Sequence, residues 1–183
     1  MTSTVGDYLF SRLAEIGVRR VLGHNRNTLF IGSIQRNRLD YSNTNGEFYS
    51  EAVGAFVVSS QAEDLDACYA AGTRLFPWRP VVFVVEHASA QYQDLSQITH
   101  GHAFASATVL NSPATAASQI NRALTTMLYE RKPVYIGISL AVAGQMMPNG
   151  SIGVSSASGG GGGAASGAEQ ENSAKAAVAM GFI

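Results

Sequence analysis

The run PVVFVVE at residues 80–86 is the strongest strand signal in this chain of 183 residues. It is apolar up to its final glutamate, as expected for a strand in a parallel sheet whose two faces are both covered. A second apolar run, AFVVSS at residues 55–60, precedes it, and residues 62–75 between the two place apolar side chains on one helical face. Strand, helix and strand in this order predict a parallel βαβ unit.

The same alternation extends in both directions along the chain. Residues 5–16 are predicted to form a helix that Thr4 caps and Gly17 ends, followed by a strand at 18–22. The other predicted elements are a helix at 27–35, strands at 39–42, 107–110 and 133–139, and a helix from Pro113 to Arg131-Lys132. That last helix is expected to point inward Ala116, Ile120, Ala123, Leu124, Met127 and Leu128. The predicted fold class is α/β, a three-layer parallel sheet with helices on both faces.

Composition narrows the class of protein. The chain is 46% hydrophobic and 14% charged, with a formal net charge of -1, so no basic surface for nucleic acid or an anionic membrane is expected. No apolar run approaches the roughly 20 residues that span a bilayer, and the first residues do not read as a secretion signal. The single cysteine, Cys68, cannot form an internal disulfide. A cytoplasmic protein is expected.

The chain changes character near Pro148. Residues 1–148 carry the predicted α/β domain, whereas residues 149–168 are rich in Gly and Ser and include five consecutive glycines at 159–163. Such a segment loses much backbone entropy and buries little, so it is predicted to be a flexible linker. Residues 169–183 form an Ala-rich tail, predicted to contain a short helix.

Three stretches resemble the N-terminal pyrimidine-binding domain of the thiamine-diphosphate-dependent pyruvate and indolepyruvate decarboxylases. They are VGDYLFSRLAEIGVRRVLG at 5–23, GAFVVSSQAEDLDACYAAG with RPVVFVVE at 54–72 and 79–86, and ATVLNSPATAASQINRALTTMLYERKPVYIGIS at 107–139. The resemblance implies that family's layered α/β fold and its cofactor, thiamine diphosphate. In the family, a separate domain holds Mg²⁺ and the diphosphate through a Gly-Asp-Gly motif, which these 183 residues lack. The resemblance therefore implies self-association or a partner chain that carries the diphosphate-binding domain, with Mg²⁺ not held by this chain.

The resemblance also assigns the residue that would contact the aminopyrimidine ring. The family uses a glutamate in an Asn-Glu-Leu-Asn-Ala-Ala helix, whose carboxyl group promotes the imino tautomer of the cofactor. An ungapped match from Asn45 puts Gly46 at that position, and one inserted residue puts Glu47 there. Glu47 is the candidate for both catalysis and cofactor binding, and the alternative is a solvated loop carboxylate.

Two further segments match the family's catalytic loops. The family has a Gly-Val-Pro-Gly-Asp turn after its first strand, where this chain has Asn27 at the aspartate position. Asn27 is a cofactor-binding candidate, and His24 is the second catalytic candidate, as a partial substitute for the aspartate. An amide has no proton to exchange near neutral pH, so the family's proton relay is lost at Asn27. The family's His-His pair corresponds to His100-Gly101-His102, and His100 is the third catalytic candidate. Both histidine positions have the alternative of loop residues without a role, and no metal site is predicted.

Three functions remain open at this point. The first is a thiamine-diphosphate-dependent 2-oxo-acid decarboxylase-like protein reduced to its pyrimidine-binding domain and inactive alone. The second is a non-catalytic assembly or regulatory partner of a full-length decarboxylase. The third is a small-molecule binder or enzyme that uses the vacated pocket.

Overall fold

The computed structural model describes residues 3–23, 28–43, 52–59, 62–76, 79–87 and 103–148. The chain divides after Gly153 into two units, and every described residue belongs to the first. The predicted linker at 149–168 and tail at 169–183 lie outside the described residues. Within the part that is described, no helix is both long enough and apolar enough to cross a membrane.

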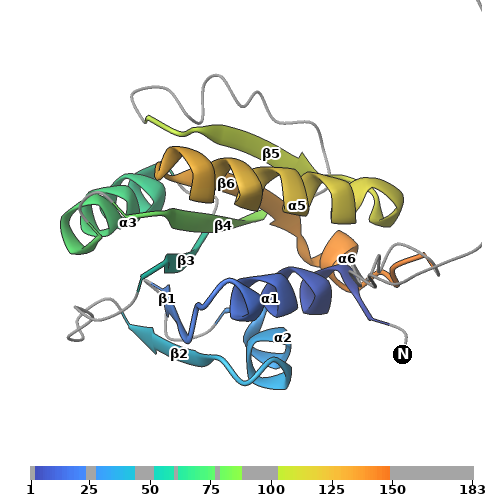
Figure 1. Cartoon of the computed structure of the whole chain (residues 1–183). Helices are drawn as coiled ribbons and strands as arrows, with labels where there is room; N and C mark the ends of the chain where they lie inside the picture. The colour runs from blue at the N-terminus through green and yellow to red at the C-terminus, as the bar shows by residue number, and fades with distance from the viewer. Residues whose placement is uncertain are drawn as a thin grey trace, which may run out of the picture. The chain divides into compact units, whose positions relative to one another are not determined.

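A six-stranded sheet forms the centre of the fold (Figure 1). Every strand pair is parallel, in the order β2-β1-β3-β4-β6-β5. The strands are β1 (Arg20–Gly23), β2 (Asp40–Asn43), β3 (Gly54–Ser59), β4 (Val81–His87), β5 (Ser106–Leu110) and β6 (Val134–Ser139). The inner strands β3, β4 and β6 are almost wholly buried, as expected where both faces of a parallel sheet are covered. The predicted α/β class and parallel sheet are confirmed.

Helices cover both faces of the sheet. They are α1 (Val5–Glu15), α2 (Ile31–Arg36), α3 (Ala62–Leu75), α5 (Pro113–Glu130) and α6 (Leu140–Ala143). The alternation of side chains along β4 separates the two cores, because Val82 and Val84 join one cluster while Phe83 and Val85 join the other. The three-layer prediction is therefore confirmed.

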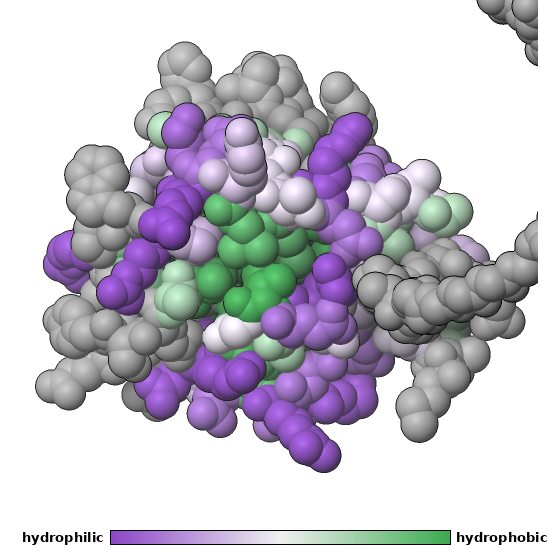
Figure 2. Space-filling model, in the orientation of Figure 1, coloured by the Kyte–Doolittle hydropathy of each residue, from purple (hydrophilic) through white to green (hydrophobic). Residues whose placement is uncertain are grey.

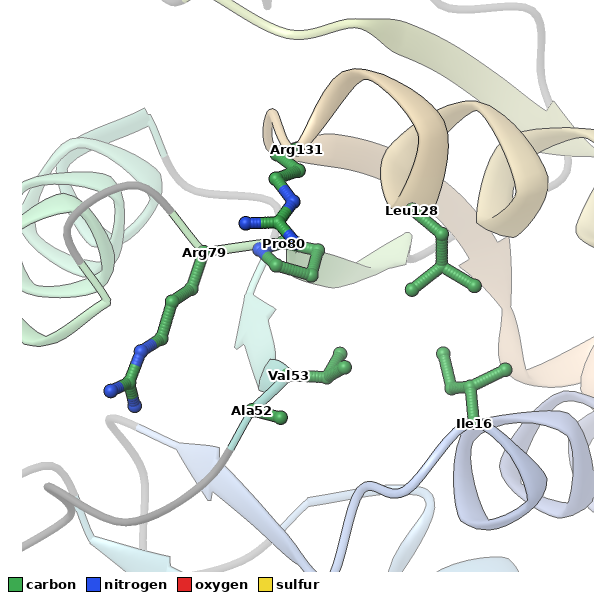
Figure 3. A pocket seen from close by; sticks show the side chains of 7 residues that line it. All are labelled: Ile16, Ala52, Val53, Arg79, Pro80, Leu128 and Arg131. Carbon is green, nitrogen blue, oxygen red and sulfur yellow. The ribbon is translucent and has the colours of Figure 1, made fainter.

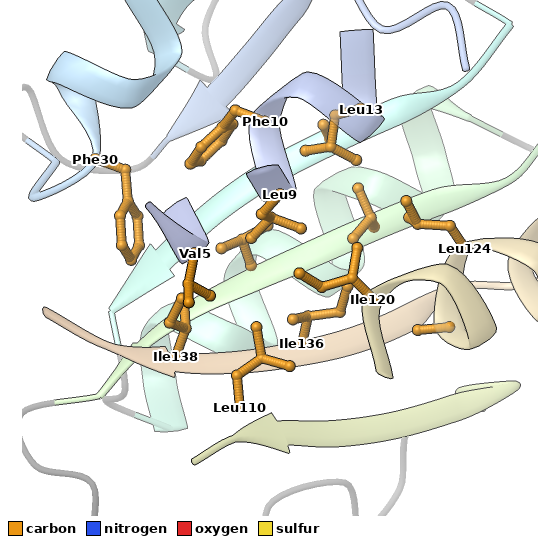
Figure 4. Packing of buried hydrophobic residues seen from close by; sticks show 14 of the residues in the cluster. Val5, Leu9, Phe10, Leu13, Phe30, Leu110, Ile120, Leu124, Ile136 and Ile138 are labelled. Carbon is orange, nitrogen blue, oxygen red and sulfur yellow. The ribbon is translucent and has the colours of Figure 1, made fainter. Parts of the chain in front are cut away.

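The first core lies between the sheet and the helices α1, α2 and α5. It is largely aliphatic, and Figure 4 shows Leu9, Leu13, Ile120 and Leu124 within it. These four residues and Met127 are each no more than 2% exposed. Fully burying one such side chain is worth about 1.5–3 kcal/mol.

The second core lies under α3 and is aromatic. Phe56 stacks on Phe83 with ring centroids 5.3 Å apart, and Phe104 meets Phe83 and Tyr135 edge to face. Cys68 on α3 is buried in this cluster, and burial raises the pKa of its thiol to about 11. Cys68 is therefore a residue of this core.

Local signals place the helix ends. Thr4 accepts a hydrogen bond from the amide of Asp7 at the start of α1, and Ser112 accepts one from Ala114 at the start of α5, where Pro113 is the first helical residue. Gly17, with φ of 99°, turns the chain after α1 as predicted. The helix predicted at 62–75 has the bounds of α3.

Other predictions are wrong in detail. The helix predicted at 27–35 is shorter and begins only at Ile31, because Thr28 and the Leu29 amide are hydrogen-bonded to the end of β4 instead. Leu128 was expected to point inward but is 41% exposed. Strand β1 begins two residues later than predicted, and the short helix α6 was not predicted.

Candidate functional site at the carboxyl edge of the sheet

The carboxyl ends of all six strands lie along one edge of the parallel sheet. From β1 the chain continues to β2 on one side, and β3 and β4 lie on the other side of β1. The chain direction therefore switches between β1 and β3, as the strand order in Figure 1 shows. Ligands of open α/β sheets bind outside the carboxyl ends of the strands at such a switch point. This edge is the place where a functional site is expected.

Each candidate residue from the sequence follows a strand that ends at this edge. His24 and Asn27 come after Gly23 of β1, Glu47 comes after Asn43 of β2, and His100 lies in the connection that leaves β4 after His87. These three connections follow β1, β2 and β4, which lie within one run of neighbouring strands, β2-β1-β3-β4. They therefore leave the sheet at the same edge. The four candidate residues themselves lie outside the described residues, and their roles stay predictions.

Tyr41 of β2 lies across the end of β1. A Cβ atom built on Gly23 would come within 1.8 Å of the Tyr41 hydroxyl, so the aromatic ring occupies the space that a larger residue at position 23 would need. Burial, and after it the negative charge of Glu86, raise the pKa of the Tyr41 phenol to about 12. The phenol is therefore protonated at neutral pH and acts as a hydrogen-bonding group rather than a base.

Glu86 connects β4 to the segment that precedes α2. Its Oε1 accepts hydrogen bonds from the Thr28 hydroxyl and from the Leu29 amide, the latter at 3.0 Å. The Thr28 hydroxyl oxygen accepts a further bond from the Phe30 amide at 3.1 Å, and Thr28 is only 6% exposed. A carboxylate with backbone and hydroxyl donors on one oxygen holds two chain segments together.

A histidine–tyrosine pair links the neighbouring strands β4 and β6. His87 Nε2 lies 2.9 Å from the Tyr135 hydroxyl, and the two residues are 2% and 0% exposed. Gly137 makes room for the imidazole, since a Cβ atom there would lie 2.4 Å from Nε2. Burial also raises the pKa of Tyr135, so its phenol stays protonated at neutral pH.

Sequence reasoning did not single out Tyr41, Glu86 or Tyr135. The available signals were weak: a glycine at a strand end, and one carboxylate that ends the most apolar strand. Thr28 and Glu86 are 58 residues apart in the chain, and no local pattern pairs them. Only the strand order brings them together.

These residues do not by themselves fit thiamine diphosphate. Within the described ranges, no three His, Cys, Asp or Glu side chains gather in a way that would hold a metal ion. Glu86, the carboxylate at the end of β4, already accepts two bonds within the protein, and Asp64 at the start of α3 accepts the Ser59 hydroxyl. A carboxylate for the aminopyrimidine ring would have to come from a connection outside the described residues, such as the one that contains Glu47.

Comparison with known proteins tests the fold. No protein-family model matches the chain, and no curated protein matches it. Among solved structures, the thiamine diphosphate-dependent 4-hydroxybenzoylformate decarboxylase of Rhodococcus jostii RHA1 is similar with a TM-score of 0.65 and 15% sequence identity. The match covers 82% of this chain and 33% of that chain, so this chain corresponds to about a third of the decarboxylase. The chain has the α/β fold of a domain in a thiamine-diphosphate-dependent decarboxylase.

Proposed function

We propose that this chain is the pyrimidine-binding half of a thiamine-diphosphate-dependent 2-oxo-acid decarboxylase-like protein in the cytoplasm, and that these 183 residues do not decarboxylate alone. The diphosphate-binding half is then supplied by a partner chain that carries it, and self-association remains a separate expectation. The observation that carries the proposal is the carboxyl edge of the sheet. The three connections that resemble the family's catalytic loops follow strands β1, β2 and β4, which end there.

The need for a second component follows from what these residues lack. The Gly-Asp-Gly motif for the metal and diphosphate does not occur in the sequence. The described residues contain no cluster of metal ligands, and the chain matches only a third of the similar decarboxylase. Thiamine diphosphate would supply the electron sink for decarboxylation, and this chain would contribute a carboxylate that faces its ring.

A non-catalytic assembly or regulatory role is the second candidate. It is favoured by Asn27, which occupies the position of the family's aspartate, and by Gly46, which takes the glutamate position in an ungapped match. On this alternative the chain keeps the fold and the surface for association and contributes no acid. The catalytic candidate requires a carboxylate from Glu47, and the assembly candidate does not. A substitution of Glu47 therefore distinguishes the two.

A complementation assay distinguishes the candidates. The chain is mixed with a full-length thiamine-diphosphate-dependent decarboxylase whose own pyrimidine-activating glutamate has been replaced by Gln, and 2-oxo-acid decarboxylation is measured together with association by sedimentation. Restored turnover with the wild-type chain supports the catalytic proposal. The catalytic proposal also requires that Glu47→Gln abolish the restored turnover and that the neighbouring substitution Glu51→Gln leave it intact.

The other outcomes are equally informative. Association without restored turnover supports the assembly role and contradicts the catalytic one. Absence of both association and turnover, with the chain shown to be folded by circular dichroism, contradicts both.

A further inference from the structure

An apolar hollow lies at the amino edge of the sheet, opposite the candidate site. Its volume is about 520 Å³. Its lining comes from the ends of α1 and α5 and from the residues before β3 and β4, and comprises Ile16, Ala52, Val53, Arg79, Pro80, Leu128 and Arg131 (Figure 3). Figure 2 shows apolar residues gathered in the middle of the viewed face, with hydrophilic residues around them. Nothing in the proposed function uses this side of the molecule.

The hollow results from the way α1 and α5 end. Both helices cover the same face of the sheet, and their C-terminal ends reach its amino edge. Met127 is fully buried against the sheet, whereas the next residue, Leu128, is 41% exposed. In Figure 3 Leu128 and Ile16 face each other on one side of the opening, and Val53 lies on the other side and points toward them. The floor of the hollow is therefore aliphatic and open to solvent.

Arg131 places a positive charge beside this floor. Its φ of 54° lies in the left-handed region, which a non-glycine residue occupies at a cost of roughly 1–2 kcal/mol and where a helix commonly ends on glycine. The side chain is exposed, and within the described residues it forms no ion pair or hydrogen bond. Figure 3 shows its guanidinium group beside Pro80 at the margin of the hollow. Among the described residues that line the hollow, none has an acidic side chain.

We propose that this hollow binds a small amphipathic anion, whose carboxylate pairs with Arg131 and whose aliphatic body lies on Ile16, Val53 and Leu128. A guanidinium group presents a planar donor pair that matches a carboxylate. The apolar floor adds affinity only for a ligand with a hydrocarbon portion, which sets such a ligand apart from inorganic anions. The volume falls in the range of small-molecule pockets.

Titration of the ¹⁵N-labelled chain with sodium octanoate, followed by amide chemical shifts, tests the proposal. Saturable shifts confined to the amides around Val53, Leu128 and Arg131 are expected, with a Kd on the order of 1 mM. Acetate has the carboxylate without the long hydrocarbon chain. Octylamine has the hydrocarbon chain with a positive charge in place of the carboxylate. Both are expected to bind at least about fivefold more weakly than octanoate.

Two variants and one matched control locate the interaction. Arg131→Gly removes the guanidinium in a conformation that glycine prefers, and it should weaken octanoate binding about fivefold. Leu128→Gln keeps a good helix former and should weaken it by a similar factor. The control Lys132→Ala removes the adjacent exposed cation and should change the Kd less than about twofold.

The proposal is overturned by any of three results. These are shifts that scatter over the surface without saturation, equal affinity for octanoate and octylamine, and an unchanged Kd in Arg131→Gly. The outcome is independent of the decarboxylase proposal, because neither thiamine diphosphate nor turnover enters the measurement.

Discussion

The two edges of the sheet differ in how their side chains are used. At the carboxyl edge, polar side chains are paired inside the protein, as in the bonds of Glu86 to Thr28 and Leu29 and of His87 to Tyr135. At the amino edge, an exposed Leu128 and an arginine with no ion-pair partner among the described residues border an open hollow. One edge is consolidated by hydrogen bonds, and the other has apolar surface and charge available to a ligand.

This contrast separates residues that hold the fold together from residues that are available to a ligand. A parallel sheet makes its carboxyl edge the usual place for a ligand, yet the described residues there mainly hold the fold together. Substitutions of the described residues at the carboxyl edge should therefore act on stability, and those at the amino edge should act on binding.

Gly137→Ala should produce the largest effect. The new Cβ atom would lie 2.4 Å from His87 Nε2, in a site where the imidazole is 2% exposed and hydrogen-bonded to Tyr135. Overpacking together with loss of this bond should lower the free energy of unfolding by about 3 kcal/mol. Urea denaturation measures the change, and Gly144→Ala is the matched control, because its Cβ atom would meet nothing closer than 3.6 Å. Equal stabilities of the two variants would show that the His87 site is loosely packed.

Glu86→Ala should have the next largest effect. It removes the acceptor of the Thr28 hydroxyl and of the exposed Leu29 amide. Leaving the hydroxyl of the buried Thr28 without this partner costs about 2 kcal/mol. Denaturation gives the energy, and hydrogen exchange at the Leu29 amide should accelerate relative to amides in β6. The control Glu130→Ala removes a surface carboxylate that pairs with Lys132 at 3.5 Å and should change stability by less than about 0.5 kcal/mol. A null result at Glu86 would refute its role as a link between β4 and α2.

The Tyr41 phenol should make stability fall in alkali. Its pKa is raised from 10.0 to about 12 in the folded protein. Unfolded chains ionise first as pH rises above 10, so the folded state loses stability between pH 10 and pH 12. Tyr41→Phe should lose less stability over this interval than the wild type, and tyrosinate absorbance in the folded wild type should include a component with a midpoint near pH 12 that the variant lacks. If Tyr41 titrates near 10 in the folded protein, its burial against Gly23 is wrong.

Leu128→Gln at the amino edge should have the smallest effect on folding. Leu128 is 41% exposed, so its replacement should alter the free energy of unfolding by less than about 0.5 kcal/mol. Thermal and urea denaturation check this value. A loss comparable with that of Glu86→Ala would mean that the hollow is part of the core rather than a surface for ligands.

The fold was predictable because its signals are local. The continuous apolar run at 80–86 predicted a covered parallel strand, Thr4 and Ser112-Pro113 marked helix starts, and the residues of α3 were assigned correctly. Leu128 was misassigned because helical periodicity cannot reveal that the sheet below it has ended. The start of α2 was misassigned because Thr28 and Leu29 bond to Glu86, which is remote in sequence.

The candidate site was predictable only as a location. Resemblance selected the connections after β1, β2 and β4, and the strand order makes their strands end at one edge. Tyr41 contacts Gly23, and His87 pairs with Tyr135, because their strands are neighbours in the sheet. The sequence alone does not show which strands are neighbours. The roles of Glu47, His24, Asn27 and His100 stay predictions, because these residues lie outside the described residues.

Calorimetric titration of the purified 183-residue chain with thiamine diphosphate and Mg²⁺ tests the central claim most directly. The claim is that this fold supplies the pyrimidine side of a site and depends on a second component for the metal and the phosphates. We predict no saturable heat at cofactor concentrations up to about 1 mM. A Kd of about 1 mM corresponds to a binding free energy of only about 4 kcal/mol. Stoichiometric, Mg²⁺-dependent binding with a micromolar Kd by the single chain would contradict it.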